Sequence, residues 1–167
     1  MAIRVVPYDA EWTRWFEEER AVLERVLAPW LEGGIHHVGS TAIPGIAAKP
    51  IVDMVAGVRE FEEARAASKP LRGHGYRYAP HRAGIAHHFE KCGRFGLHLT
   101  EPGSDVWRER LAFRDLLRGD PALAAEYEAL KVRLAQEHPD DVTAYTAGKR
   151  EFVARVLATV GLEPGRR

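Results

Sequence analysis

Residues 50–58 constrain the fold more than any other part of the chain, because they have the pattern of a strand buried within a sheet. Successive side chains of a strand point to opposite faces, so Ile51, Asp53, Val55 and Gly57 are expected on one face. Asp53 is the one ionisable group in this apolar stretch. A carboxylate in low dielectric needs a metal ion, a base or a hydrogen-bond donor as its partner. The strand therefore predicts a polar site on one of its faces.

A glycine–serine turn precedes this strand. Apolar residues lead into Gly39, whose missing Cβ permits a sharp turn or the close approach of a ligand. Ser40 follows, with a hydroxyl that can cap a helix or bind a phosphate oxygen. For an isolated Gly-Ser pair the alternative is an ordinary β-turn with a structural aspartate nearby. The combination of turn and strand favours a site that handles phosphate.

The run from His37 to Asp53, HVGSTAIPGIAAKPIVD, closely resembles the GrpB family, whose members are similar to nucleotidyltransferase-superfamily domains. The resemblance extends from Val6 near the start to Tyr145 and Lys149 near the end. It implies an α+β fold, a mixed β-sheet flanked by an N-terminal helix and three C-terminal helices. It also implies a functional link to coenzyme A biosynthesis, because some members are fused to dephospho-coenzyme A kinase.

The chain departs from the superfamily at the metal site. That site resembles Asp-x-Asp or Asp-x-Glu, since side chains two positions apart on a strand face the same way. The second position here is Val55, which cannot bind Mg²⁺. Glu90 is the candidate acid from a later strand, although an acid in a charged stretch is more often solvated. We expect Asp53 and Glu90 to bind Mg²⁺ weakly, with a nucleotide supplying the remaining ligands.

Three cations fall on the apolar faces of the last predicted helices. Winding at 100° per residue places Arg110 and Arg114 on one such face and Lys149 on another. Arginine offers a planar fork and lysine a point charge, so the three predict a phosphate clamp. The structural alternatives are an ion pair between Arg114 and a buried carboxylate such as Asp53, or long stems that reach the surface.

The histidines add two hypotheses. His98 alternates with apolar residues at 95–100, and the resemblance puts this strand near the site, so His98 is a candidate base or substrate ligand; a structural histidine is the alternative. His37 and His88, each one of an adjacent pair, would form a transition-metal hydrolase site with Asp53. That hypothesis lacks any His-Glu-x-x-His or Cys-x-x-Cys spacing.

Periodicity and turn residues predict the order of the elements. One domain is expected over 1–160, with a frayed tail at 161–167. The predicted helices are 9–31, stopped by Gly33-Gly34, then 59–68, ending before Pro70, and 104–118, 120–137 and 141–160, and the predicted strands are 35–38, 50–58, 75–79, 85–91 and 95–100.

Composition bounds the partners. The 167 residues are 46% hydrophobic, enough for one core, and the single cysteine, Cys92, cannot form an intrachain disulfide. Lys plus Arg and Asp plus Glu each number 24, so no overall basic field attracts nucleic acid. No signal peptide or long apolar run is present, which predicts a cytoplasmic protein that does not contact membranes.

We therefore expect a nucleotidyltransferase-like protein that binds a nucleotide or phosphorylated small molecule, with Mg²⁺-dependent nucleotidyl transfer as the activity. The alternative is a degenerate phosphate-binding module without activity, as Val55 suggests. Gly39, Ser40 and Asp53 should border one concave site with at least one of Arg114, Lys149 and His98. The assigned catalytic residues are Asp53 and His98, the metal ligands are Asp53 and Glu90, and the phosphate-binding residues are His37, Gly39, Ser40, Thr41, Lys49, Arg110, Arg114 and Lys149.

Overall fold

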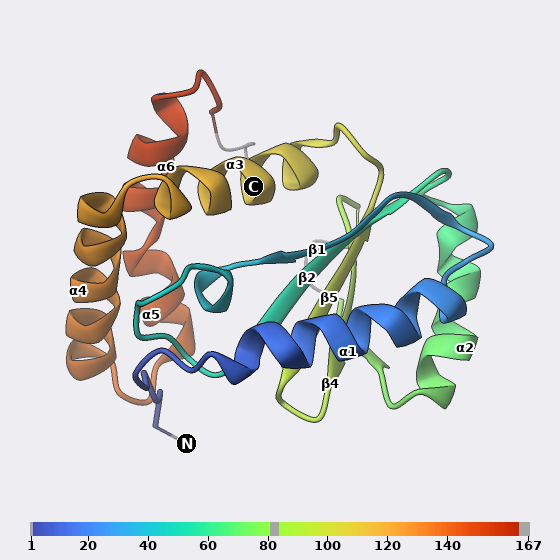
Figure 1. Cartoon of the computed structure of the whole chain (residues 1–167), viewed down its shortest axis with the longest axis horizontal. Coiled ribbons are helices and arrows are strands. Elements are labelled where there is room, and N and C mark those ends of the chain that lie inside the picture. Colours follow the sequence, from blue (N-terminus) through green and yellow to red (C-terminus); the bar gives the residue numbers. More distant parts are fainter. Residues whose placement is uncertain (1, 81–83, 164–167) are drawn as a thin grey trace.

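The strands form a single mixed sheet. The computed structural model describes residues 2–80 and 84–163 (Figure 1). The sheet order is β1-β2-β5-β4-β3, in which only the β2–β5 pair is parallel. The strands are β1 Leu31–Val38, β2 Val52–Val58, β3 Arg77–Tyr78, β4 His87–Lys91 and β5 Phe95–Thr100. This mixed sheet confirms the α+β class expected from the sequence.

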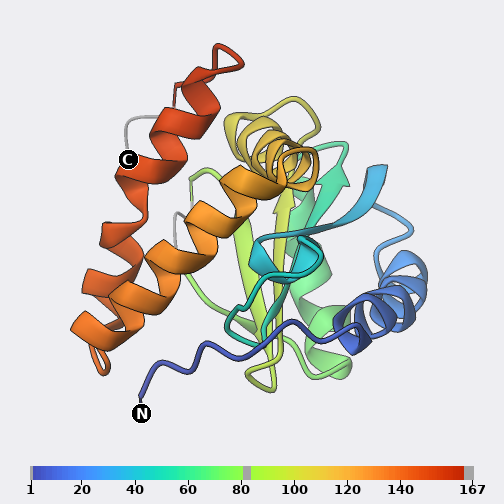
Figure 2. The ribbon, with the colours of Figure 1, turned by 60° about the vertical axis from the view of Figure 1, so that its left-hand side comes forward.

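Helices lie on both sides of the sheet, as Figure 2 shows with blue α1 on one side and orange to red α4, α5 and α6 on the other. The first side has α1 Glu11–Val26 and α2 Ser68–Gly73, with the 3-10 helix η2 Glu63–Ala67 before α2. The C-terminal helices are α3 Asp105–Arg118, α4 Pro121–Glu137, α5 Val142–Gly148 and α6 Arg150–Ala158. There are four of them, not three, because the segment predicted as one helix at 141–160 divides at Lys149.

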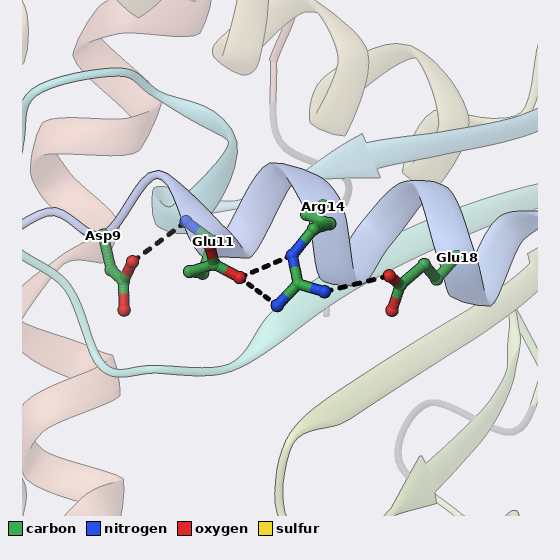
Figure 3. Close-up of polar contacts among 4 residues, drawn as sticks. All are labelled: Asp9, Glu11, Arg14 and Glu18. Carbon is green, nitrogen blue, oxygen red and sulfur yellow. Dashed lines mark hydrogen bonds and ion pairs between the residues drawn. The ribbon is translucent and has the colours of Figure 1, made fainter.

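Helix α1 is attached to the sheet by its apolar face. Trp12, Phe16 and Leu23 are buried against the sheet in the larger of the two cores. The opposite face is exposed and holds ion pairs, with Arg14 between Glu11 and Glu18 (Figure 3). Exposed pairs of this kind contribute little to stability, so burial of the apolar face holds the helix in place.

Three predicted boundaries are wrong for local reasons. Helix α1 ends at Val26 and not at 31, because a turn brings the chain into β1. Gly33 and Gly34 are part of β1, where positive φ angles of 85° and 83° accompany an irregular register. Pro70 does not stop a helix but lies in the first turn of α2, where a backbone N–H is not needed.

The two faces of β2 differ, as its alternation predicts. Val52, Met54, Ala56 and Val58 face α1 and α2 and are fully buried in the larger core. Asp53 and the residues two and four positions later point to the other face, toward the C-terminal helices. Those helices form their own core with Ile43 and Ile46 of the loop before β2, which leaves space between this core and the sheet.

No helix within residues 2–80 and 84–163 is long and apolar enough to cross a membrane. The predicted frayed tail falls largely on residues 164–167, which lie outside the described residues.

Candidate functional site

A cavity of about 370 Å³ opens between the second face of the sheet and the junction of α5 with α6. Its walls come from segments far apart in the sequence: the loop before β2, strands β2, β4 and β5, and the end of α5. The residues that line it are Ser40, Lys49, Ile51, Asp53, His88, Glu90, Gly93, Phe95, Gly96, Tyr145 and Lys149. The structure therefore brings Ser40, Asp53 and Lys149 to one concave site.

Two glycines make room for the Asp53 carboxylate. A Cβ added to Gly39 would lie 3.0 Å from Asp53 Oδ2, and one added to Gly96 would lie 2.6 Å from Oδ1. Gly39 also has a φ of 76°, which side chains rarely adopt. The absence of a Cβ at both glycines therefore leaves the space that the carboxylate occupies at the cavity wall.

The charges around Asp53 are mainly positive. Burial raises the pKa of the Asp53 carboxyl, and Arg110, Lys149 and Lys49 oppose this increase, while Glu90 adds to it. The side chain is in contact with the cavity, yet protein surrounds it on its other sides. Ionisation of Asp53 therefore depends on cations from a loop and from two separate helical segments.

Lys49 and Lys149 share one aromatic ring. Their Nζ atoms lie 5.4 Å and 4.7 Å from the centre of the Tyr145 ring. Neither ammonium group donates a hydrogen bond or forms an ion pair with any described residue, so the N–H donors of both side chains are available to a ligand. Burial, together with the charge of Lys49, lowers the pKa of Lys149 to about 8, and Asp53 opposes this. The Lys149 ammonium group is therefore still mostly charged at neutral pH.

The break between α5 and α6 puts Lys149 at the cavity. Lys149 is the residue that ends α5 and precedes α6. A Cβ on the preceding Gly148 would lie 2.4 Å from Leu134 Cδ2 of α4, so only glycine lets this junction pack so closely on α4. Apolar periodicity continues through the break, which explains why the sequence predicted one helix.

Helix α4 anchors the loop that carries Lys49. The Lys131 Nζ donates to the Ala47 carbonyl oxygen at 2.6 Å, and the Ala47 amide donates to the Glu128 carboxylate. Tyr127 of the same helix hydrogen-bonds the Ser40 side chain, while burial raises the pKa of its phenol. These α4 residues were missed in the sequence, although Lys131 gives the same signal as Lys149, a cation on an apolar helix face.

His88 and His98 stack on the same face of the sheet as Asp53. Their rings are nearly parallel, at 4°, with centroids 4.3 Å apart, and the two residues pair across β4 and β5. His88 lines the cavity, whereas His98 is not among the residues that line it. The role of His98 as base or ligand stays a prediction, and His88 is the member of the pair that reaches the cavity.

His37 and Thr41 face away from the cavity. The His37 ring stacks on Phe16 of α1 at 4.9 Å, and Nε2 lies 2.9 Å from Thr41 Oγ1. Because the Thr41 hydroxyl donates to the Ile51 carbonyl, His37 Nε2–H is the donor to Thr41. Burial and the nearby Arg118 lower the pKa of His37 to about 4. His37 cannot share a metal site with Asp53 and His88, so the hydrolase hypothesis is wrong.

Arg114 is also held elsewhere. Its guanidinium donates to the His37 carbonyl at 3.2 Å and pairs with Asp115 at 2.8 Å. It therefore neither lines the cavity nor pairs with Asp53, and Arg110, one turn earlier on α3, is the arginine whose charge acts on that carboxyl. Of the three cations of the predicted clamp, Lys149 lines the cavity, Arg110 acts on Asp53 through its charge, and Arg114 lies elsewhere.

The residues do not fit the two-carboxylate metal site of the superfamily. Glu90 does reach the cavity with Asp53, as predicted. Val55, at the position of the second strand acid, is fully buried. In the part of the chain that the structure describes, no group of three or more His, Cys, Asp and Glu side chains is placed to bind a metal ion. Asp53 is surrounded by cations instead.

The sequence matches the GrpB family, described as GrpB protein, over residues 2–159. The chain belongs to the GrpB family. A relative of this family, the UPF0157 protein YqkA of Bacillus subtilis, is 37% identical over 90% of the chain, which spans 45% of that protein. The glutamate-rich protein GrpB of Alkalihalophilus pseudofirmus is 34% identical over 92% of both chains. A dephospho-CoA kinase of Mycolicibacterium paratuberculosis matches at 29% identity, over 90% of the chain and 44% of the kinase.

Solved structures give the same family and fold. The conserved protein GrpB of Enterococcus faecalis superposes with a TM-score of 0.83 at 29% identity, covering 94% of this chain and 99% of that one. Terminal uridylyl transferase 4 of Trypanosoma brucei, with bound UTP, superposes with a TM-score of 0.53 at 16% identity, over 93% of this chain and 56% of the transferase. The second likeness confirms the nucleotidyltransferase-like fold alone.

Proposed function

We propose that this GrpB protein binds a small phosphate-bearing molecule, such as a nucleotide, in the cavity beside Asp53. The observation that carries the proposal is the pair of lysine ammonium groups, Lys49 and Lys149, whose N–H donors no described residue uses. A phosphate group accepts several charge-assisted hydrogen bonds at once, which suits two ammonium groups at one cavity. Arg110 adds positive charge from α3.

The fold and the relatives support a nucleotide as the ligand class. The uridylyl transferase that shares the fold holds UTP, and a family relative is a dephospho-CoA kinase. Nucleotides and coenzyme A precursors are therefore the first ligands to test. The cavity of about 370 Å³ is within the size range of small-molecule sites.

Mg²⁺-dependent nucleotidyl transfer is the second candidate, favoured by the meeting of Asp53 and Glu90 at the cavity. In that scheme both carboxylates would hold the ion and His98 would take the proton of the acceptor. The cations around Asp53 and the valine at position 55 count against it. Binding without transfer is therefore the function that the site supports best.

Thermal shift and calorimetry with nucleotides and coenzyme A precursors test the proposal. Lys149→Met should weaken binding at least tenfold, because it removes one ammonium and keeps most of the stem volume. Lys69→Met is the matched control, since Lys69 is exposed on α2, on the other side of the sheet. Equal affinity in both variants, or no binding of any phosphate compound by the wild type, would contradict the proposal.

A further inference from the structure

The charges of the cavity lead beyond the proposed function, on which the following inference rests. We infer that the ammonium groups of Lys49 and Lys149, with the guanidinium of Arg110, take the place of the divalent cation, so that the phosphate-bearing ligand binds without metal. The superfamily's strand motif would neutralise phosphate through an ion held by two acids. In this chain Val55 occupies the position of the second acid, and cations lie around the first, Asp53.

The position of Asp53 is the first step. Gly39 and Gly96 leave the space in which the two carboxylate oxygens lie, since a Cβ on either glycine would come within 3.0 Å of one oxygen. Mg²⁺ demands six oxygen ligands in near-ideal octahedral geometry. Glu90 is the one further carboxylate that lines the cavity within the described residues. Two carboxylates leave most of the coordination shell to water and ligand.

The charges around Asp53 favour an anion over a metal ion. The groups that act on Asp53 include three cations, and the only acid among them is Glu90. With Asp53 itself counted, Lys49, Lys149 and Arg110 stand against two acids, so the group has a formal net charge of +1 before any metal ion enters, and the excess comes from Arg110. A divalent cation beside Asp53 would be repelled by the three cations, whereas a phosphate anion is attracted to them.

The placement of the two lysines is the third step. Tyr145 holds both Nζ atoms over its ring, which lets two like charges stay close together at the cavity wall. Asp53 contributes to this balance, since its charge opposes the decrease in the pKa of Lys149. Asp53 on this view stabilises the lysines electrostatically and is not itself a ligand of the phosphate.

Binding of pyrophosphate and of UTP, measured by calorimetry in excess EDTA and in excess Mg²⁺, tests the inference. We expect binding in EDTA, and Mg²⁺ should leave the affinity unchanged or lower it, because the ion competes with the lysines for the phosphate oxygens. Lys149→Met should reduce the affinity in EDTA at least tenfold, and Lys69→Met should not change it.

Asp53→Asn separates the two roles of the carboxylate by the sign of its effect. If the cavity binds phosphate through its cations, loss of this negative charge keeps or increases the affinity in EDTA at a pH low enough to hold Lys149 charged without Asp53. If Asp53 holds a metal ion, the same substitution reduces binding that depends on Mg²⁺.

Binding that requires Mg²⁺ and is lost in Asp53→Asn would overturn the inference and leave the proposed function standing. Failure of pyrophosphate and all nucleotides to bind under both conditions would refute the proposed function as well. The comparison in EDTA and Mg²⁺ uses the wild type, so it holds even if a variant fails to fold.

Discussion

A single methyl group at Gly96 should disturb the site more than most larger substitutions elsewhere. In Gly96→Ala the new Cβ would lie 2.6 Å from Asp53 Oδ1, and neighbouring strands hold both residues. We expect a loss of about 1–3 kcal/mol in the free energy of unfolding, as for other overpacked sites, together with weaker ligand binding. Urea unfolding measures the first and calorimetry the second.

Gly73→Ala is the matched control for this substitution. Gly73 lies in α2, and no atom is within 4 Å of the Cβ that the substitution would add. Its stability should equal or slightly exceed that of the wild type, because alanine favours a helix by up to about 1 kcal/mol over glycine. Equal losses at positions 73 and 96 would show that the contact with Asp53 is unimportant.

Lys131 should make the free energy of unfolding increase as the pH rises from neutral into the alkaline range. The side chain is 1% exposed, and burial lowers its pKa to about 7 from the ordinary value of 10.5. Between these two values the unfolded chain binds more protons at this position than the folded one, so stability rises with pH. Relative to Lys131→Met, the wild type should gain about 1.4 kcal/mol per pH unit across this window.

Urea unfolding of both proteins at several pH values between about 7 and 10 tests this expectation. The difference between the two proteins isolates Lys131, because the other titrating groups are common to both. A difference that stays constant with pH would mean that Lys131 titrates normally in the folded state.

At the level of single residues, the sequence predicted the cavity but not all of its neighbours. Asp53 and Lys149 stood out because each is charged on an apolar face, and the structure places both at one cavity. Arg114 gave the same signal and points to the His37 carbonyl instead. Periodicity identifies the packed face of a helix, but it cannot tell which part of that face meets a cavity and which part meets a backbone.

Helix α1 offers a test of what attaches an element to this sheet. Leu23 is fully buried in the larger core, whereas Arg14 lies in the exposed ion pairs of Figure 3. Leu23→Ala should cost about 2–5 kcal/mol, because it leaves a cavity in the core. Arg14→Ala should change stability by less than about 1 kcal/mol, since exposed pairs contribute little. Comparable losses in the melting temperatures of both variants would contradict this account.

Elements with strong local signals were the most predictable. The limits of β5 are those expected, and α3 and α4 begin within a residue of their predicted starts, where Ser104 and Asp120 cap them. The element boundaries near Gly33, Pro70 and Lys149 were less predictable. In each case tertiary packing decided the outcome, through a bulge, a first-turn proline or a tight junction with α4, and local residue preferences do not contain that information.

The whole sheet predicts a gradient of protection against hydrogen exchange. Strands β2 and β5 each have a partner on both sides, and their fully buried core residues lie between helices. Their amides should exchange slowest, near the limit set by global unfolding, while β3 at the sheet edge should exchange fastest of the strands. Mass spectrometry of peptides after deuterium labelling measures this order. Faster exchange in β2 than in β3 would contradict the predicted gradient.

The distribution of the cavity walls along the chain has a consequence for synthesis. The ribosome makes Ser40, Asp53 and the strands early, while Tyr145 and Lys149 follow about a hundred residues later. A nascent chain in which β2 already pairs with β5 therefore places Asp53 in the sheet before Lys149 has been synthesised. The charge of Lys149 lowers the pKa of the Asp53 carboxyl. Each new molecule therefore gains this effect only when its final helices pack against the sheet.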